Sequence, residues 1–367
     1  MSENTKVYSA NGHVIYEFEG SADIEALNEF GESDFIGDNA SFFYGDEIEF
    51  AYAESPALTD VQELNKTVFA RYFTDTGTPE TEQYQAAAAK LAQTPLRYNR
   101  IINSSKNVAL VQALIEAGII ANRRVYIDID GTLSPEAAIA WKNQFNYDAQ
   151  SGMYLSWLYA PIVRTDPTGV SGVMTFGTSG MRAGYAAAHN MNLNALGLPP
   201  LQQPIAGKDF MLSGTRIAET RTLTDSELAL LAENKIIPVM YQEYHDGSGF
   251  VWTDSLSGAK KSGISKLESA ADISIWAQET WGRFSKSLEQ KPMTEAIKQA
   301  KIFTERTLKQ METSGWLVPS ATLGAAYAYE IFPNQRYPDD RLEIVLHLSC
   351  NGVVRRVTVS SRLYNTL

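Results

Sequence analysis

Two carboxylates at the end of one apolar segment are the residues of this sequence best placed to do chemistry. The segment Arg124–Ile129 has a strand pattern and leads through Asp128 into Asp130, with a glycine directly after. Carboxylates in such a place can bind Mg²⁺ or act as covalent nucleophiles. The same residues also have a structural interpretation, in which the strand ends in an Asp-Gly turn and Ser134 starts a helix.

The stretch VYIDIDGTL resembles the strand-end motif of haloacid-dehalogenase-like phosphatases. The resemblance implies Asp128 as the nucleophile, Asp130 as the acid/base and a bound Mg²⁺. Such an enzyme also needs a hydroxyl after a second strand, a lysine for the phosphate and a later carboxylate pair for the metal. The candidates for these parts are Thr175 or Thr178, Lys208, and Asp339 with Asp340. The last pair follows the loop-like stretch NQRYP and no apolar strand, so the structural interpretation is favoured and the phosphatase is kept as an alternative.

Other residue types that carry chemistry lack the necessary spacing. The stretch GTSG at 177–180 does not have the spacing of a nucleophile elbow, and no glycine-rich stretch carries the Lys-Ser/Thr of a phosphate loop. The single Cys350 cannot form a disulfide within the chain. The four histidines are not paired as zinc ligands are: His13, His189, His245 and His347. We therefore expect no enzyme, no catalytic residue, no metal and no cofactor.

Charge is distributed unevenly along the 367 residues. Residues 1–60 contain 14 Asp and Glu against one Lys, and the rest is almost neutral. An acidic segment repels nucleic acids and anionic membranes, so we expect no nucleic-acid contact and a protein partner with a basic surface. No apolar run is long enough for a membrane span, and the first residues lack the pattern of a signal peptide.

The middle of the chain alternates helical and strand patterns, which predicts an α/β fold. A helix is expected at 108–117, ended by Gly118, and another from Ser134 to Phe145. Strands are expected at 124–129, 154–163 and 173–176, and a helix at 180–189. A Thr-x-x-Glu capping box predicts a helix at 224–234, followed by a hairpin of strands 236–244 and 249–253. Two long patterns, 270–288 and 294–313, predict antiparallel helices.

Both ends of the chain have strand patterns. Residues 7–18 read as one extended strand without an obvious local partner, with Asn11-Gly12 as a possible turn. At the other end, alternating apolar residues over 342–348 are followed by an Asn-Gly pair and a second run at 353–363, which predicts a hairpin. In that hairpin Leu346 would face Val357, and Ile344 would face Val359.

From residue 124 on, the order of segments resembles the sheath proteins of contractile phage tails, a family that includes the sheaths of R-type tailocins and contractile injection systems. The strand and helix of VYIDIDGTLSPEAAIAWKNQF are followed by the aromatic strand MYLSWLYAPIV and the small-residue helix GTSGMRAGYAAAHN. The proline-rich LGLPPLQQPIAG, the helix-to-strand stretch TDSELALLAENKIIPVM and GFVWTDSL come next. The Gly-Ala-Arg-Thr-Leu stretch that the family has after this Trp is absent here. Two long helices and a terminal strand pair close the pattern.

The resemblance implies a structural subunit that assembles with itself as stacked, hexameric rings around an inner tail tube. Baseplate and tail terminator proteins are implied as further partners, and the virion tail as the location after assembly in the host cytoplasm. Contraction of the sheath would drive the tube through the host envelope. Strands from both ends would pair with neighbouring subunits, which assigns this role to Val7, Val14, Tyr16, Phe18, Val357 and Val359. Another phage tail component is the remaining structural alternative.

The expected fold class is α/β (α+β) with several domains. An N-terminal strand arm (1–20) precedes an outer α/β domain (21–245). An inner tube-facing α/β domain with two long helices (246–345) is completed by exchanged N- and C-terminal strands, the second from a C-terminal strand arm (346–367). Lysines on the two long helices form a candidate face for an acidic tube: Lys286, Lys298, Lys301 and Lys309. The alternative is an ordinary solvated helix face.

Overall fold

The computed structural model describes residues 5–8, 14–18, 81–94, 98–165, 172–212, 217–260, 263–353 and 355. The chain divides into two compact units, one of residues 1–80 with 163–174 and the other of residues 81–162 with 175–367. Within the described ranges, no helix combines the length and the apolar character that crossing a membrane requires. The predicted boundaries at residues 20, 245 and 345 stay predictions.

In the first unit the N-terminal segment forms two strands. Strand β1 (Thr5–Tyr8) pairs antiparallel with β2 (Val14–Phe18), and Val7 lies opposite Tyr16 in this register. The prediction of one extended strand without a local partner is therefore wrong, because the segment folds back on itself. The Asn-Gly pair expected as a turn lies outside the described residues. Most residues of two short strands also belong to this unit: β6 (Ile162–Thr165) and β7 (Val173–Thr175).

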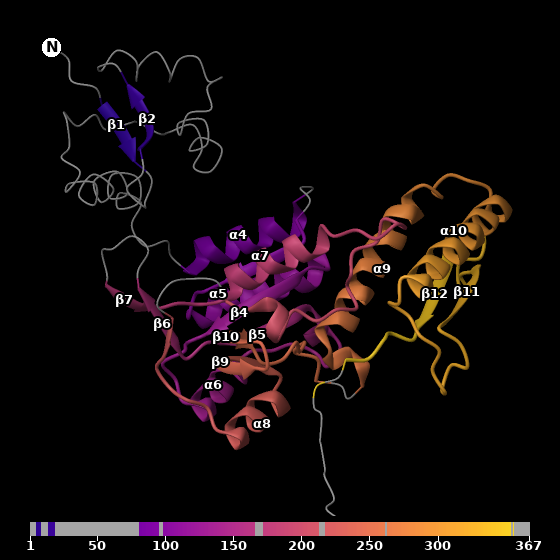
Figure 1. Ribbon diagram of the computed structural model, residues 1–367. Coiled ribbons are helices and arrows are strands. Elements are labelled where there is room, and N and C mark those ends of the chain that lie inside the picture. Colours follow the sequence, from indigo (N-terminus) through magenta and orange to yellow (C-terminus); the bar gives the residue numbers. More distant parts are fainter. Residues whose placement is uncertain are drawn as a thin grey trace, which may run out of the picture. The chain divides into compact units, whose positions relative to one another are not determined.

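The second unit is built on a five-stranded sheet in the order β10-β9-β5-β4-β3, in which β3, β4, β5 and β9 run parallel and β10 antiparallel (Figure 1). Its strands are β3 (Arg100–Asn103), β4 (Arg124–Ile129), β5 (Leu155–Tyr159), β9 (Ile236–Tyr244) and β10 (Gly247–Trp252). Its helices are α4 (Thr81–Gln93), α5 (Val108–Ala121), α6 (Pro135–Lys142), α7 (Ser179–Asn190) and α8 (Asp225–Glu233). Short elements are η2 (Ser151–Tyr154), η3 (Lys208–Phe210), η4 (Ile264–Lys266) and β8 (Ala218–Glu219). The α/β prediction is confirmed.

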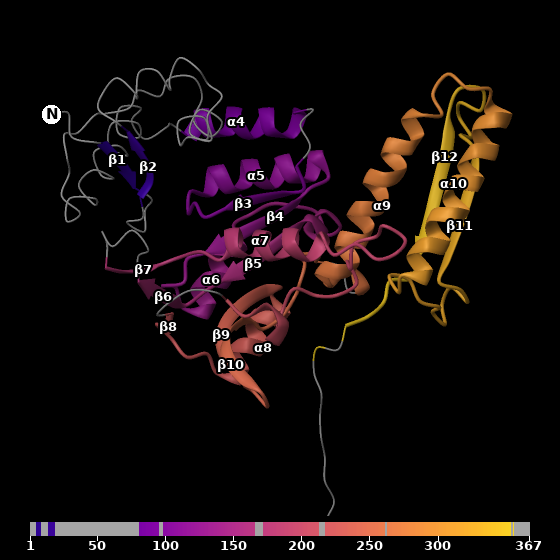
Figure 2. The ribbon, with the colours of Figure 1, turned by 45° about the horizontal axis from the view of Figure 1, so that its top comes forward.

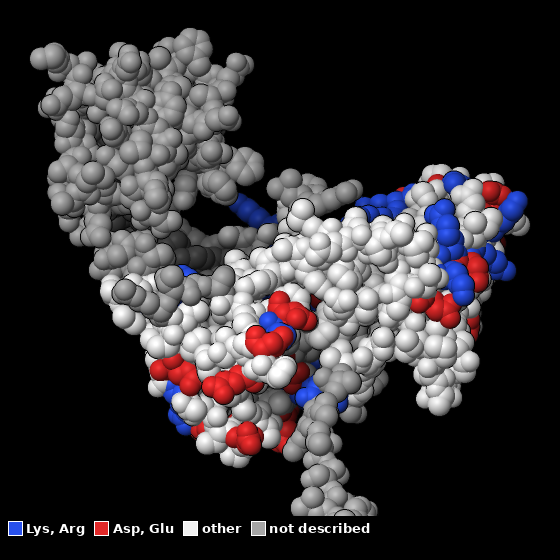
Figure 3. All heavy atoms as spheres, in the orientation of Figure 1, with Lys and Arg blue, Asp and Glu red and all other residues white. Residues whose placement is uncertain are grey.

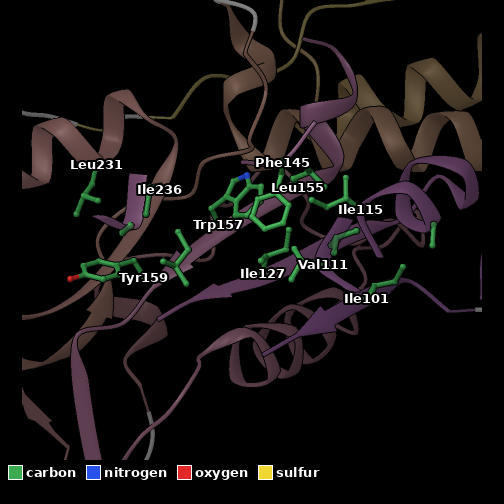
Figure 4. Close-up of a cluster of buried hydrophobic side chains, with 14 of the residues drawn as sticks. Ile101, Val111, Ile115, Ile127, Phe145, Leu155, Trp157, Tyr159, Leu231 and Ile236 are labelled. Atoms are coloured by element: carbon green, nitrogen blue, oxygen red, sulfur yellow. The ribbon is translucent and has the colours of Figure 1, made fainter. Parts of the chain in front are cut away.

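Each face of the sheet carries its own apolar cluster because side chains alternate along a strand. Ile127 on β4 joins Trp157 and residues of α5 and α8 in one cluster, shown in Figure 4. Tyr126, one position earlier, joins Ala186 of α7 in the cluster on the opposite face. Buried strands with apolar side chains on both faces are typical of a parallel sheet covered by helices on each side.

Capping residues explain where several helices begin or end. Two predicted helix ends, those of α5 and α6, differ from the observed ones. Ser134 accepts a hydrogen bond from Ala137 N, as predicted, but α6 ends at Lys142, before Phe145. Gly118 does not end α5. The helix continues to Ala121, and Asn122, in the left-handed conformation, caps its end. A side chain at Gly118 would collide with Val125 of β4, so this glycine permits the close approach of helix and strand.

The C-terminal part of the same unit is a helical hairpin on a two-stranded sheet. Helix α9 (Glu268–Lys286) is followed by α10 (Met293–Thr313), and the rings of Phe284 and Phe303 stack at 3.8 Å between them. Figures 1 and 2 both show α10 alongside the sheet of β11 (Tyr327–Pro333) and β12 (Leu342–Leu348). A third apolar cluster, containing Trp316, fills the space between helices and sheet.

Strand β12 pairs with a strand that the sequence analysis did not predict. Its register places Leu346 opposite Tyr329 and Ile344 opposite Ile331 of β11, a strand that sequence reasoning missed. Residues 351–353 form no strand, and the predicted partners Val357 and Val359 lie outside the described residues. The predicted hairpin with residues 353–363 therefore stays a prediction. Strand β11 suits β12 because its alternating apolar face completes the cluster under α10.

Candidate assembly site

Asp128 lies where the sequence places it, at the end of β4, but its carboxylate holds the start of another helix. Oδ1 accepts from the backbone N–H groups of Thr178 at 2.8 Å and Ser179 at 2.9 Å, and Oδ2 accepts from Ser179 Oγ at 2.5 Å. Gly177 lets α7 come this close, because a side chain there would collide with the Asp128 carboxylate. Both oxygens thus cap α7 from a neighbouring strand.

Burial raises the pKa of Asp128 to about 6, although the hydrogen bonds from Ser179 and Thr178 lower it. Desolvation favours the neutral carboxyl, and the donors at the helix start favour the charged one. Asp130 is more exposed and pairs with Lys106, while its Oδ1 accepts from Thr132 N at 3.0 Å. The two carboxylates of the motif therefore belong to two separate local networks.

The other phosphatase candidates lie on the surface or make other contacts. Thr175 is exposed at the end of β7. Thr178 Oγ1 accepts a hydrogen bond from Trp252 Nε1 at 3.2 Å, and Lys208 pairs with Asp246. Asp339 and Asp340 lie between β11 and β12, outside the α/β sheet. Among the described residues, no group of three or more His, Cys, Asp or Glu could hold a metal ion. The structure therefore does not assemble the metal carboxylates that the phosphatase alternative requires from these residues.

A buried ionic network joins the sheet to the first turn of α9, and sequence reasoning missed it. Arg182 of α7 and Glu268 of α9 lie 2.5 Å apart, with side chains 0% and 3% exposed. Arg124 of β4 donates to Asp272 at 2.7 Å and to the Glu268 carbonyl at 3.2 Å. Burial raises the pKa of Glu268, but Arg182 and Arg124 outweigh it and hold this pKa below its usual value.

The proline-rich loop between α7 and β8 makes a second attachment of the helical hairpin to the sheet. Trp316 Nε1 donates to the Pro199 carbonyl at 2.9 Å, and Asn194 donates to Ser314 Oγ at 2.8 Å. Leu198 and Leu201 enter the same apolar cluster as Trp316. The C-terminal helices are thus held to the sheet by ionic contacts at one place and by apolar contacts at another.

The predicted tube-facing lysines are all exposed on α9 and α10. Lys309 forms an ion pair with Glu312 at 2.8 Å, and no ion pair is found for Lys286, Lys298 or Lys301 in the described part of the chain. Ile302, 61% exposed, lies beside Lys301 on α10. Figure 3 shows Lys and Arg atoms gathered over these helices with acidic atoms among them. The face is basic and mixed with carboxylates.

The sheet of β11 and β12 offers edges for a further strand. Among the described residues it has two strands and no third. Its inner face packs under α10, and its outer positions carry residues such as Glu330 and His347, both exposed. A short sheet with open edges can accept a strand from another chain, with backbone hydrogen bonds as the main contact.

Comparisons with known proteins give structural matches alone: no family model and no curated protein matches the chain. A chain of the sheath complex of an extracellular contractile injection system, PVC, in the contracted state matches with a TM-score of 0.56. The match has 11% identity and covers 81% of this chain and 84% of that chain. A chain of the anti-feeding prophage baseplate matches with a TM-score of 0.56 and 12% identity, over 76% of this chain and 72% of that one. The fold is thus one found in contractile injection systems.

Proposed function

We propose that this chain is the structural, non-enzymatic subunit of a contractile tail sheath. It assembles with itself as stacked rings around an inner tail tube, and contraction drives the tube through a host envelope. The particle tail is its location, and baseplate and terminator proteins are its partners at the two ends. The observation that carries the proposal is the shared fold with a chain of a sheath complex over four fifths of both chains.

The open sheet of β11 and β12 supports subunit linkage by strand exchange. Strands from neighbouring copies add to its edges, and the arms that supply them contain Val7, Val14, Tyr16, Phe18, Val357 and Val359. In the single chain β1 and β2 pair with each other, so exchange requires this pairing to be replaced by pairing with a neighbour. A strand tethered to its own subunit has a high effective concentration at the next one.

Electron microscopy of the purified chain, alone and with residues 1–20 deleted, tests the proposal. Stacked rings or hollow tubes are expected from the full chain, and their loss is expected on deletion. Monomers from the full chain over a range of concentrations and with the tube protein added would contradict the sheath role. Tubes that persist after the deletion would contradict the N-terminal strand exchange alone.

The lysines of α9 and α10 support a tube-facing role for this end of the subunit. Reversing Lys298, Lys301 and Lys309 to glutamate is expected to weaken assembly templated by an acidic tube, because the reversed charges repel it. Self-assembly without the tube serves as the control and should be unchanged. Unaltered templated assembly would refute the tube contact.

A further inference from the structure

One buried lysine has no carboxylate partner among the described residues. Lys142, at the last turn of α6, is 7% exposed, and its Nζ lies 5.7 Å from the centre of the Trp157 ring. No ion pair with a carboxylate is found for it in the part of the chain that the structure describes. Burying a cation without a counterion costs free energy, which a cation–π contact offsets in part.

Two further lysines act on Lys142, and one of them lies on a neighbouring aromatic ring. Lys260 donates to the Tyr147 carbonyl at 3.0 Å and lies 4.3 Å from the centre of that ring, which stacks on Trp157. Lys235 donates to the Glu233 carbonyl at 3.2 Å. Burial, together with repulsion from Lys260 and Lys235, lowers the pKa of Lys142 to about 8. We call Lys142, Lys235 and Lys260 the lysine cluster.

The acids near this cluster are Asp148, Asp254 and Glu233, and the first two have other hydrogen-bond partners, although Asp148 also attracts Lys260. Asp148 accepts from Ser151 N and Gln150 N at 2.7 Å, and both oxygens of Asp254 accept from Arg355. Glu233 is exposed and acts on Lys235 through space. Lys266 adds positive charge beside Lys235, and Arg355 offsets the charge of Asp254. The local charge therefore stays positive, and a carboxylate from outside would stabilise it.

We propose that the lysine cluster binds the carboxylates of residues 20–60 of a neighbouring copy of this chain. This proposal rests on the proposed self-assembly. Residues 20–60 carry 11 Asp and Glu, no Lys or Arg, and seven Phe and Tyr. Their carboxylates match the unneutralised lysines, and their aromatic side chains match the rings of Tyr147 and Trp157.

Charge complementarity favours this partner over a nucleic acid. A phosphate backbone that approached the cluster in an assembly would also meet the acidic segments, which repel it. The lysines of α10 are a poorer match for the segment, because Glu295, Glu305 and Glu312 lie among them. Helix α10 has four Lys and Arg against these three Glu, a net charge of +1, whereas the five cations at the lysine cluster exceed the three acids named there by two.

Zero-length cross-linking with a water-soluble carbodiimide tests the contact in the full chain. An equal mixture of ¹⁴N and ¹⁵N chains is assembled and cross-linked, and mass spectrometry identifies the joined residues. Cross-links of mixed isotope between residues 20–60 and Lys235 or Lys260 are expected. The proposal would be overturned if all cross-links joined residues of the same isotope, or if the links went to other lysines. It would also be overturned if these links were absent and added duplex DNA protected the cluster.

A charge reversal at the two more accessible lysines provides the matched variant. Lys235→Glu with Lys260→Glu is expected to raise the concentration needed for assembly about tenfold, because two contacts per interface become repulsive. The control, Lys298→Glu with Lys301→Glu, should shift it less than about twofold in the absence of a tube. Assembly of the first variant at the wild-type concentration would overturn the proposal. A wild-type chain that never assembles refutes the sheath role, whereas assembly with cross-links elsewhere refutes this contact alone.

Discussion

Two regions of the molecule bury charged side chains, and they differ in how those charges are neutralised. At the start of α9, Arg182 and Glu268 form an ion pair in which both side chains are almost fully buried. At the end of α6, Lys142 is also buried, but its charged group contacts the face of the Trp157 ring. The first arrangement is complete within one chain and fixes the helical hairpin to the sheet. The second has no carboxylate partner among the residues that the structure describes, which is the property expected of a surface that meets a partner.

Removing one member of the complete pair tests the comparison most strongly. Glu268→Gln leaves the buried Arg182 without its counterion and is expected to reduce the free energy of unfolding by about 3–5 kcal/mol. Urea unfolding of the unassembled chain measures this loss. The double variant Arg182→Met with Glu268→Leu should lose much less, because no unpaired charge is left. A single variant as stable as the wild type would contradict the role of the pair.

Replacing Lys142, for which the described residues supply no carboxylate partner, is expected to change the free energy of unfolding in the opposite direction. Lys142→Met is expected to increase the free energy of unfolding at pH 7 by up to about 3 kcal/mol, because the folded chain no longer buries a cation. In the wild type the pKa of Lys142 is about 8 when folded and near 10.5 when unfolded. The unfolded state therefore binds more protons between these values, and wild-type stability rises with pH there.

Urea unfolding of both chains at pH 7 and pH 10 separates this effect from other titrating groups, and the difference between the chains should shrink at pH 10. Lys298→Met, at an exposed position, is the matched control and should change stability by less than about 0.5 kcal/mol. A destabilised Lys142→Met chain would mean that the amino group has a stabilising partner.

The Asp128 carboxylate that caps α7 is expected to have an effect of intermediate size on stability at acidic pH. Its pKa of about 6 in the folded chain lies above the ordinary 3.8, so the folded state binds more protons between about pH 4 and 6. Wild-type stability attributable to Asp128 should thus fall by about 2 kcal/mol as the pH rises through this range. In Asp128→Asn this fall should be absent, as measured by thermal unfolding at pH 4.5 and 6.5. An unchanged profile would contradict the assignment.

The smallest effect is expected at a capping box on the surface. Thr224 accepts from Glu227 N at 3.3 Å, and Glu227 accepts from Thr224 N at 2.8 Å. Thr224→Ala should cost about 1 kcal/mol, because the start of α8 loses one acceptor. A loss above about 3 kcal/mol in urea unfolding would mean that this threonine does more than cap the helix.

Local patterns of the sequence predicted the elements whose stabilisation is itself local. The strands 124–129 and 236–244 have the predicted bounds, and the Thr224 capping box is present as predicted. Strand β11 was missed because its partner lies beyond a loop and because its position depends on the cluster that it completes under α10. Such tertiary packing leaves little trace in the sequence.

The polar features of the candidate site were least accessible from the sequence. Arg182 and Glu268 are 86 positions apart, and each occupies a helix position that a charged residue usually holds in solvent. Lys142 lies near the end of α6, where a positive charge is ordinarily favourable, so its position gives no sign of its burial. The Asp128 motif was visible, but its donors come from a helix start 50 residues later, and these contacts define its role.

The last described residue has a mechanical consequence. Arg355 donates through Nε to both oxygens of Asp254, at 3.1 and 3.0 Å, in the loop that follows β10. Asn351 N donates to the Trp316 carbonyl, a few residues before. A pulling force applied to the chain beyond residue 355 therefore meets an ionic anchor on the sheet unit before it reaches β12. Tension from that side would be carried by the α/β sheet, and the two-stranded sheet under α10 would be spared from peeling.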